Sequence, residues 1–548
     1  MTARQDGLAE ASAAGHVHSL VRALRGPTAH PAPEACPRDH FAGMQQRIGR
    51  ATATVRGSQR RSVVVLPSRS VDRWHESPPE TRSYEERFLS FLFELRDPRL
   101  ELTYITSLPV APCTIDYYIS LFPPRLRLSA RKRLRLVSLG DGAQRPLSEK
   151  LLERPRVLEQ IRRTVADPAV AYLMPYNSTG LERDIALALD IPVYGADPEH
   201  AWLGTKSGGR ALFDQAGVPH PLGAQNIRSS ADAVSAIRAL RAAKPRLAEL
   251  VIKLDNAASG EGNALLDLTA LPAPGTPGED VLIEQRLAGL IPEVDGVSAA
   301  AYLRKLATNG GVVEERITGR DLRSPSVQLL ITPAGGVELL STHDQILDGR
   351  SGQQFAGCRF PADPSYAPAI SALARRAAER LADTGVIGRL AIDFLVSRRA
   401  DGGWQPFALE VNLRMGGTTH PYQTLARLTG GSYDPHTASF TTPRGHPRHY
   451  VATDRLEIPQ LRALGRASLL ARAARDLRFD HKRAQGAVFH MLSSVEPLAT
   501  VGVTAIADDP ESADALHEHV RTVLTRGRNR RAFRALIGPA RVAIDTTG

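Results

Sequence analysis

The sequence has few cysteines and no long apolar run, and these absences exclude several classes of protein. Its three cysteines, Cys36, Cys113 and Cys358, lie far apart in 548 residues and show no metal or redox spacing. No apolar segment approaches the roughly 18 residues of a membrane-spanning helix, and the first residues lack the apolar region of a signal peptide. We therefore expect a protein of the reducing cytoplasm with no membrane partner.

Lysines and aromatic residues are also scarce, which bears on nucleic-acid binding. The net charge is +11, but only seven of the 69 basic residues are lysines, and the arginines are spread along the chain. Aromatic residues make up 5% and do not alternate with basic runs as a base-stacking surface requires. We therefore expect no specific nucleic-acid partner. In a chain that prefers arginine, Lys206 and Lys253 stand out because each lies beside small residues, which suggests that a compact ammonium group is needed there.

The length requires more than one hydrophobic core, and the first part of the chain predicts an α/β domain. Apolar strands alternate with helical segments over residues 46–195, which is typical of a largely parallel sheet. Among these segments we expect single helices over residues 84–95 and 149–165. Residues 1–45 are rich in Ala, His, Pro and Arg and are expected to form a mostly disordered tail.

Two segments after residue 200 have features of phosphate binding. Lys206 and Arg210 lie at the start of a predicted helix, a geometry that faces phosphate. Lys253 lies in an apolar strand that leads into a loop of small residues, where backbone N–H groups can surround phosphate. The loop includes Ser259, Gly260, Gly262 and Asn263. An ordinary strand–turn–strand connection would use the same residues.

Residues 312–317 predict a short strand with two adjacent carboxylates. Adenine recognition commonly needs backbone groups and a side-chain acceptor, which Glu314 and Glu315 offer together. Asp321, a little further along, is a candidate for binding ribose hydroxyl groups.

Residues 389–412 predict a β-hairpin whose polar face holds oxygen ligands. Apolar residues alternate with Asp393, Glu410 and Asn412, and the intervening Arg-Arg-Ala-Asp-Gly-Gly-Trp is typical of a hairpin turn. Mg²⁺ prefers such ligands and completes its coordination with water and nucleotide phosphates. Arg414 adds positive charge where phosphate would lie. The alternative is a hairpin with a solvated polar face.

These parts follow one another in an order that resembles the ATP-grasp superfamily over about residues 200–430. The flanks resemble a narrower group, peptide ligases with a pre-ATP-grasp N-terminal domain of the pheganomycin peptide ligase type. The resemblance is carried by YGADPEHAWLGTKSGGRALFDQAGVPHP, RSPSVQLLITPAGGVELLSTHDQIL and LEVNLRMGGTTHP. It implies a pre-ATP-grasp α/β domain (46–199), a two-lobed α+β ATP-grasp domain (200–450) and a small C-terminal α/β cap (451–548).

The resemblance also implies roles for individual residues. Lys206, Arg210 and Lys253 would hold phosphates, and Ser259 to Asn263 would close over the γ-phosphate. Glu314, Glu315 and Ile317 match an adenine hinge, and Asp321 matches the acidic ribose position. Asp393, Glu410 and Asn412 match ligands for two Mg²⁺ ions, for which Mn²⁺ could substitute. Arg389 and Arg414 are alternative candidates for the arginine that binds the acyl-phosphate.

The resemblance implies an ATP-dependent ligase that forms an amide bond through an acyl-phosphate. The partners would be a small-molecule carboxylate and an amine or peptide, with His343 as a candidate for steering or deprotonating the amine. A packed histidine is the alternative for His343. A homodimer is also expected. An ATP-grasp enzyme with another acceptor and a non-catalytic nucleotide-binding module are the alternative functions.

Overall fold

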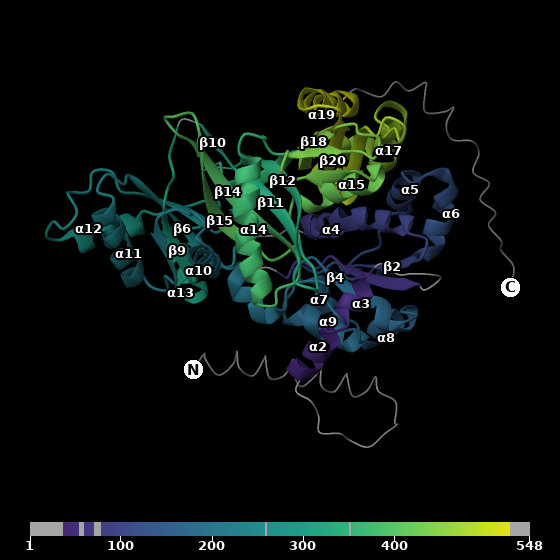
Figure 1. Cartoon of the computed structure of the whole chain (residues 1–548), viewed down its shortest axis with the longest axis horizontal. Helices are drawn as coiled ribbons and strands as arrows, with labels where there is room; N and C mark the ends of the chain where they lie inside the picture. The colour runs from purple at the N-terminus through teal and green to yellow at the C-terminus, as the bar shows by residue number, and fades with distance from the viewer. Residues whose placement is uncertain are drawn as a thin grey trace, which may run out of the picture.

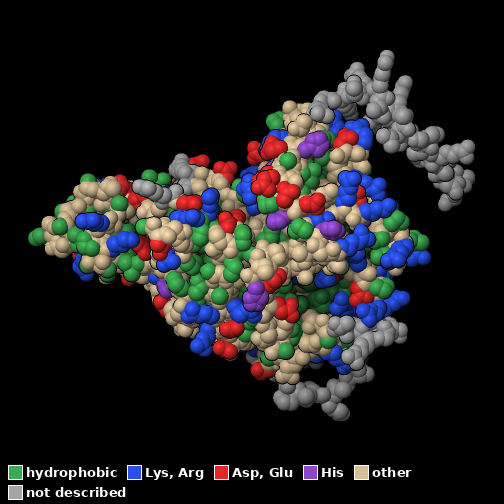
Figure 2. Space-filling view, turned by 45° about the horizontal axis from the view of Figure 1, so that its top comes forward, with side chains coloured by type: hydrophobic (Ala, Val, Ile, Leu, Met, Phe, Trp, Pro, Cys, Tyr) green, Lys and Arg blue, Asp and Glu red, His purple; other side chains and the backbone are tan. Residues whose placement is uncertain are grey.

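The computed structural model describes residues 37–53, 60–70, 78–257, 260–319, 321–349 and 352–525. Figure 1 shows a small lobe that extends from one side of a larger body, and the body contains the N-terminal domain, a large central sheet and the C-terminal segment. Lys and Arg side chains are distributed across the face drawn in Figure 2 and are interspersed with Asp and Glu. In the described part of the chain, no helix combines the length and apolar character needed to cross a membrane.

The N-terminal domain contains the predicted parallel sheet. Its four strands lie in the order β3-β2-β1-β4, and all neighbours are parallel. They are β1 (Arg61–Leu66), β2 (Leu100–Thr106), β3 (Leu134–Ser138) and β4 (Ala171–Pro175). Helices α7 (Leu147–Leu152), α8 (Pro155–Thr164) and α9 (Gly180–Leu189) follow or separate these strands. The α/β prediction for this region is confirmed.

Three local predictions in this domain need correction. The helix predicted over 149–165 is divided into α7 and α8, because Pro155 lacks an N–H and begins a new helix. The helix predicted over 84–95 is α4 (Pro78–Arg87) followed by the 3₁₀ helix η1 (Phe88–Arg96). The segment predicted as tail ends in a helix, α2 (Pro37–Gln45), because Phe41 and Met44 are buried in the core of this domain. Residues 1–36 lie outside the described part.

The small lobe is a five-stranded antiparallel sheet covered by helices. Its strand order is β5-β9-β6-β7-β8. The strands are β5 (Gly223–Ala224), β6 (Glu249–Leu254), β7 (Asn263–Asp267), β8 (Ile291–Pro292) and β9 (Gly311–Glu315). The helices are α11 (Ser230–Ala243), α12 (Glu279–Ala288) and α13 (Ala299–Asn309), and their apolar faces share one buried cluster with the sheet. Helix α10 (Lys206–Ala216) precedes the lobe.

The central sheet has nine strands and extends into the C-terminal segment. The order is β10-β14-β11-β12-β13-β18-β20-β19, and β15 pairs with β14. Its strands are β10 (Leu322–Arg323), β11 (Pro325–Ile331), β12 (Val337–Asp348), β13 (Gln354–Phe360), β14 (Gly388–Arg398), β15 (Trp404–Asn412), β18 (His449–Glu457), β19 (Gly486–His490) and β20 (Thr500–Ala507). Helix α14 (Ala367–Asp383) packs on one face.

The C-terminal segment is therefore continuous with the central sheet. The domain boundary predicted at residue 451 falls inside β18, which pairs with β13 on one side and β20 on the other. Helices α17 (Arg466–Asp476) and α19 (Pro510–Thr525) form a separate apolar cluster with these strands. The sheet joins segments that are far apart in sequence, which local patterns do not reveal.

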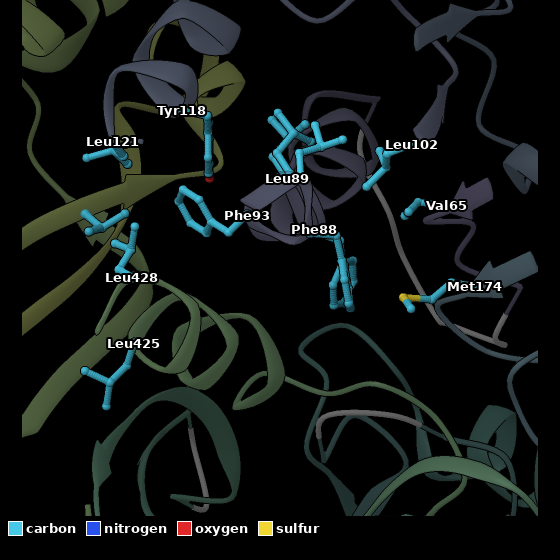
Figure 3. Close-up of a cluster of buried hydrophobic side chains, with 14 of the residues drawn as sticks. Val65, Phe88, Leu89, Phe93, Leu102, Tyr118, Leu121, Met174, Leu425 and Leu428 are labelled. Carbon is cyan, nitrogen blue, oxygen red and sulfur yellow. The ribbon is translucent and has the colours of Figure 1, made fainter. Parts of the chain in front are cut away.

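One buried cluster connects the N-terminal domain to helix α15 (Thr419–Thr429), which follows the β14–β15 hairpin. Figure 3 shows Phe88 and Phe93 of η1 between the parallel sheet, represented by Val65 and Met174, and Leu425 and Leu428 of α15. This contact places the N-terminal domain next to the loop that leaves β15.

Candidate active site

The β14–β15 hairpin brings the three predicted oxygen ligands together. The strands are antiparallel, with Asp393 opposite Glu410 and Ala391 opposite Asn412, as the sequence predicts. Nδ2 of Asn412 donates hydrogen bonds to Oδ2 of Asp393 at 3.0 Å and to Oε1 of Glu410 at 2.9 Å. The hairpin therefore gathers two carboxylates and one amide at a single point.

The electrostatics of this point suit a cation. Burial and the charge of Glu410 raise the pKa of Asp393 to about 7. Burial opposes ionisation of Glu410 too, but the ammonium of Lys206, 2.5 Å from Oε2, lowers its pKa below the usual range. A half-turn of the Asn412 amide would present its oxygen instead of its nitrogen to the same point. The donor set therefore fits Mg²⁺, which binds to carboxylate and amide oxygens.

The predicted phosphate-binding residues surround Glu314. Nη1 of Arg210 lies 2.7 Å from Oε1 of Glu314, and Nζ of Lys253 lies 2.7 Å from Oε2. Although burial favours the protonated acid, these two cations lower the pKa of Glu314. The Glu314 side chain therefore fixes the two basic side chains, and Lys253 faces the cleft while Arg210 lies behind it.

A cavity of about 680 Å³ lies between the small lobe and the central sheet. The predicted residues that line it come from both sides: Lys206, Lys253, Gly260, Gly262, Asn263, Glu314, Glu315, Ile317, Asp393 and Glu410. Glu315 accepts a hydrogen bond from the backbone N–H of Leu222 at 2.9 Å and pairs with Lys244 at 2.5 Å. The contacts of Glu315 with Leu222 and Lys244 thus hold the end of β9 in place at the cavity wall.

The loop of small residues reaches across this cavity. Gly260 has a φ of +79°, and Nδ2 of Asn263 donates to Oε1 of Gln353 at 2.7 Å, beyond the end of β12. Ser259 lies outside the described residues. The described part of the loop therefore contacts the opposite side of the cleft.

Six predicted residues in the described part of the chain are not part of the cavity lining: Arg210, Asp321, His343, Arg389, Asn412 and Arg414. His343 shares a sheet face with Asp393, because both pair with Ser326, but its ring is fully buried against Phe360 and Tyr450. Burial lowers its pKa to about 3, and its Nε2 lies 2.7 Å from the hydroxyl of Tyr450. His343 is a packed histidine here, which corrects the expectation that it handles the amine.

Arg389 and Asp321 are two more of these six. Arg389 lies four residues before Asp393, where its Nη2 donates to Oε1 of Gln423 at 3.4 Å. Asp321 pairs with Arg323 at 3.1 Å, and it is Arg323 that lines the cavity. Arg414 fits the site better than Arg389, since its side chain bonds to Tyr176 of the N-terminal domain and faces the charges of Glu410 and Asp393.

Several cavity residues were not predicted from the sequence. Nε2 of Gln345 donates to Oδ1 of Asp393 at 2.9 Å and so orients that carboxylate. Gln345 is two residues beyond His343 in β12, and residues two apart in a strand lie on the same face. The strand period could therefore have identified Gln345 as a residue on the same face as His343. Gln353, which accepts the hydrogen bond from Asn263, lies just before β13, and nothing in the local sequence predicts its position at the cavity.

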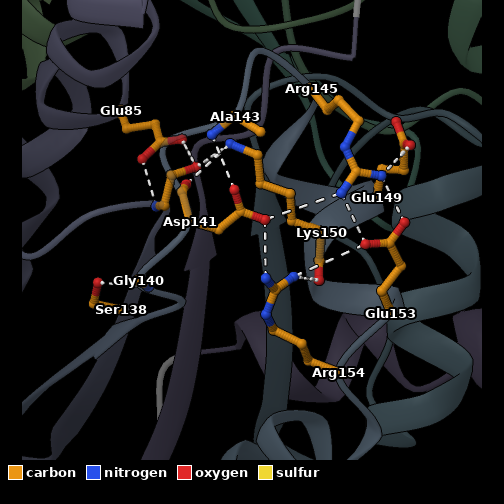
Figure 4. Close-up of polar contacts among 11 residues, drawn as sticks. Glu85, Ser138, Gly140, Asp141, Ala143, Arg145, Glu149, Lys150, Glu153 and Arg154 are labelled. Carbon is orange, nitrogen blue, oxygen red and sulfur yellow. Dashed lines mark hydrogen bonds and ion pairs between the residues drawn. The ribbon is translucent and has the colours of Figure 1, made fainter.

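A second cavity, of about 610 Å³, lies where the N-terminal domain meets the C-terminal segment, and Lys150, Arg82 and Arg466 contribute to its lining. The lysine is fully buried, and its Nζ donates to Oγ of Ser107 at 3.0 Å and to the carbonyl of Asp141 at 3.3 Å. Figure 4 shows its ammonium between Glu85 and Asp141. The scarcity of lysine therefore does not by itself distinguish Lys206 and Lys253, which line the cleft, from Lys150, which is buried in hydrogen bonds of the N-terminal domain.

Comparisons with known proteins agree with this geometry. A family model described as IQCH-like, ATP-grasp matches residues 199–276 and 297–436, and one described as PGM1 C-terminal domain matches residues 469–520. The L-propargylglycine–L-glutamate ligase of Streptantibioticus cattleyicolor is 31% identical over 476 residues, which cover 84% of this chain and 94% of that protein. IQ motif-containing protein H of Danio rerio is 23% identical over 77% of this chain and 44% of its own length.

Among solved structures, the biotin carboxylase–β,γ-ATP complex from Campylobacter jejuni has a TM-score of 0.51 at 14% identity and covers 85% of this chain and 94% of its own. This likeness shows the fold, and the 31% identity over almost the whole of the Streptantibioticus enzyme shows the family. The chain belongs to the ATP-grasp ligases.

Proposed function

We propose that this enzyme uses ATP to join a small-molecule carboxylate, an amino acid or amino-acid derivative, to the amine of another amino acid or a peptide. The observation that carries this proposal is the single cleft that collects Lys206, Lys253 and the carboxylates of Asp393 and Glu410. The Streptantibioticus relative, which its name describes as joining propargylglycine to glutamate, supports amino acids as the substrate class.

The chemistry follows from the charges in the cleft. The substrate carboxylate attacks the γ-phosphate of ATP to give an acyl-phosphate and ADP, and the amine then displaces phosphate. Lys206 and Lys253 line the cleft and would neutralise phosphate charge, and Arg414, whose charge acts on Glu410 and Asp393, would stabilise the oxyanion that forms when the amine attacks. Asp393, Glu410 and Asn412 would hold Mg²⁺, which supplies charge neutralisation and phosphate orientation. We propose two ions, with Mn²⁺ as a substitute.

Nucleotide product analysis tests the reaction. Purified enzyme with Mg-ATP and pooled amino acids and short peptides should release ADP and phosphate only when substrates are present. Asp393→Ala and Glu410→Ala should abolish the release, whereas Glu379→Gln, on the exposed side of α14, should leave it unchanged. Mass spectrometry of the pool identifies the amide. AMP and pyrophosphate as products would show adenylation and overturn the acyl-phosphate mechanism.

We also propose that the enzyme works in the cytoplasm as a homodimer. The two described cysteines, Cys113 and Cys358, are free thiols, which suits a reducing compartment. Light scattering after size-exclusion chromatography decides the oligomeric state, since a dimer has twice the 59.3 kDa mass of one chain.

A further inference from the structure

Three side chains from separate elements converge behind the loop that follows β15. They are His420 in the first turn of α15, Asp454 in β18 and His490 at the end of β19. The two Nε2 atoms of the histidines lie 2.9 Å apart, and Oδ1 of Asp454 lies 3.2 Å from His420 and 3.0 Å from His490. Within the described residues, this is the one group of three His, Cys, Asp or Glu side chains whose ligand atoms all lie within 4.8 Å of one another.

Hydrogen bonds alone do not satisfy these three atoms. If both Nε2 atoms carry a proton, both can donate to Oδ1 of Asp454, but the two N–H groups then face each other across 2.9 Å. If only one Nε2 atom carries a proton, one side of the triangle has two lone pairs that face each other. A cation at the centre would attract all three lone pairs and remove this conflict.

The size of the triangle matches a metal ion. Sides of 2.9, 3.0 and 3.2 Å place each atom about 1.75 Å from the centre. With bonds of about 2.0–2.1 Å, as Zn²⁺ makes to imidazole nitrogen and carboxylate oxygen, the ion would lie about 1 Å outside the plane. The angles between these bonds would be about 90–103°, so the three atoms would bind one side of the ion and leave its opposite side open to further ligands.

The ligand types select the ion. Two imidazoles and one carboxylate favour a first-row transition metal, whereas the all-oxygen set of the β14–β15 hairpin favours Mg²⁺. Arg87 pairs with the other oxygen of Asp454, Oδ2, and so directs Oδ1 toward the histidines.

The cluster also has a structural position that a metal ion would reinforce. His420 follows Arg414 by six residues, and Gly417 lies between them. A Cβ at Gly417 would overlap the ring of Phe355 and approach Arg87, so this loop is closely packed against the same group. A bond from His420 through an ion to β18 and β19 would fix the loop to the C-terminal strands.

We propose that His420, Asp454 and His490 bind a divalent transition-metal ion of the zinc type, separate from the Mg²⁺ ligands, and that this ion fixes the loop after β15. The test uses full-length protein that has been stripped with a chelator and is then titrated with Co²⁺ in excess Mg²⁺, which occupies the hairpin. We expect about one equivalent of Co²⁺ to bind with visible d–d absorption, and Zn²⁺ to displace it. A wild-type protein that takes up no stoichiometric Co²⁺ or Zn²⁺ would overturn the proposal and show a hydrogen-bonded triad.

Two variants separate this site from the hairpin. Asp393→Asn should retain the Co²⁺ absorption, and His490→Gln should lose it while keeping its circular dichroism spectrum. The opposite pattern would place the ion at the hairpin and refute the cluster. X-ray absorption of the zinc-loaded wild type needs no variant: imidazole scattering is expected, and oxygen ligands alone would contradict the proposal. None of these readouts depends on ligase activity, so failure of the proposed function is distinguishable.

Discussion

Lys206 is the residue that connects the two sides of the cleft most directly. Its Nζ lies 2.5 Å from Glu410 of the central sheet and donates to the carbonyl of Ala257 in the small-residue loop at 3.1 Å. The side chain is 9% exposed, so its charge acts in a partly desolvated site. A neutral side chain there would remove the ammonium group that pairs with Glu410 and, in the proposed function, one donor to the phosphates.

Lys206→Met should therefore lower kcat/KM for ATP about 100-fold, the usual loss when one preorganised donor to developing charge is removed. Steady-state kinetics with ATP varied at saturating Mg²⁺ measures this. Lys132→Met, on the exposed side of α6 (Pro124–Arg133), is the matched control and should leave kcat/KM unchanged. Equal kinetics for the two variants would remove Lys206 from the site.

Glu314 allows a prediction about stability and pH. Glu314→Gln would leave Arg210 and Lys253 buried without their counter-charge, so the free energy of unfolding should fall by about 3 kcal/mol at neutral pH. Because the folded pKa of Glu314 is below 4.5, its stabilisation is complete above pH 4.5 and is lost as the pH falls through the folded value.

Thermal unfolding from neutral to acidic pH checks both parts. The difference in Tm between wild type and Glu314→Gln should stay constant down to about pH 4.5 and narrow below it. The matched control is Glu379→Gln, where the carboxylate is exposed, and no such narrowing is expected. A difference that widens on acidification would contradict the assigned charge of Glu314.

For single residues, the sequence predicts positions that follow from the alternation of apolar and polar residues along a strand. Asp393, Glu410 and Asn412 follow this alternation in one hairpin, so the sequence alone predicts that they lie close together. The role of Glu314 depends on Arg210, 104 residues away, and the burial of His343 depends on Tyr450, 107 residues away. Contacts at such separations leave no local pattern.

Among the elements, helix α10 shows how one position fixes the start of a helix. Its N-cap Thr205 accepts a hydrogen bond from the backbone N–H of Gly208 at 2.9 Å. A Cβ at Gly208 would overlap the carbonyl oxygen of Trp202 in the preceding 3₁₀ helix η3 (Pro198–Gly204), whereas a Cβ at Gly209 would lie 3.6 Å from Val411, an ordinary contact. Two adjacent glycines in one helix thus face different constraints.

Gly208→Ala should destabilise the protein by about 2 kcal/mol, because the α10–η3 contact must open to admit the methyl group. Gly209→Ala should be neutral or stabilising by up to about 1 kcal/mol, since alanine favours helix and meets no obstacle. Urea unfolding of both variants gives the two values. Equal destabilisation would show that the close approach at Trp202 does not constrain the helix.

Element positions were largely predictable, and their connections were less so. The parallel strands of the first domain and the β14–β15 hairpin follow from apolar runs and turn residues. The helical pattern of apolar residues continues across Pro155, so it does not reveal that two helices meet there. Helix α2 is not predicted because its buried residues, Phe41 and Met44, are too few to stand out in a polar segment. The position of β18 between β13 and β20 depends on pairing that no local segment specifies.

At the scale of the whole molecule, the central sheet predicts that the C-terminal segment is required for folding. A chain that ends at residue 450 would keep only the first two residues of β18 and would lose β19 and β20, which leaves the edge of β13 and part of the adjoining core exposed. We expect this chain to lack a cooperative thermal transition and to bind a hydrophobic dye. Supplying residues 451–548 as a second chain should restore the transition. A truncated chain that unfolds cooperatively and binds ATP would contradict this view.

The continuous sheet also constrains how related enzymes can be recombined. A chimera that exchanged the ATP-grasp region at residue 450 would take the first two residues of β18 from one parent and the rest of the strand from the other, so the mismatch would lie within β18. Crossover points belong instead before η3 and after α19, where no strand pairing of this sheet is cut. Chimeras are therefore more readily built by exchanging the N-terminal domain, which has its own sheet, than by exchanging the C-terminal segment, which shares the central sheet.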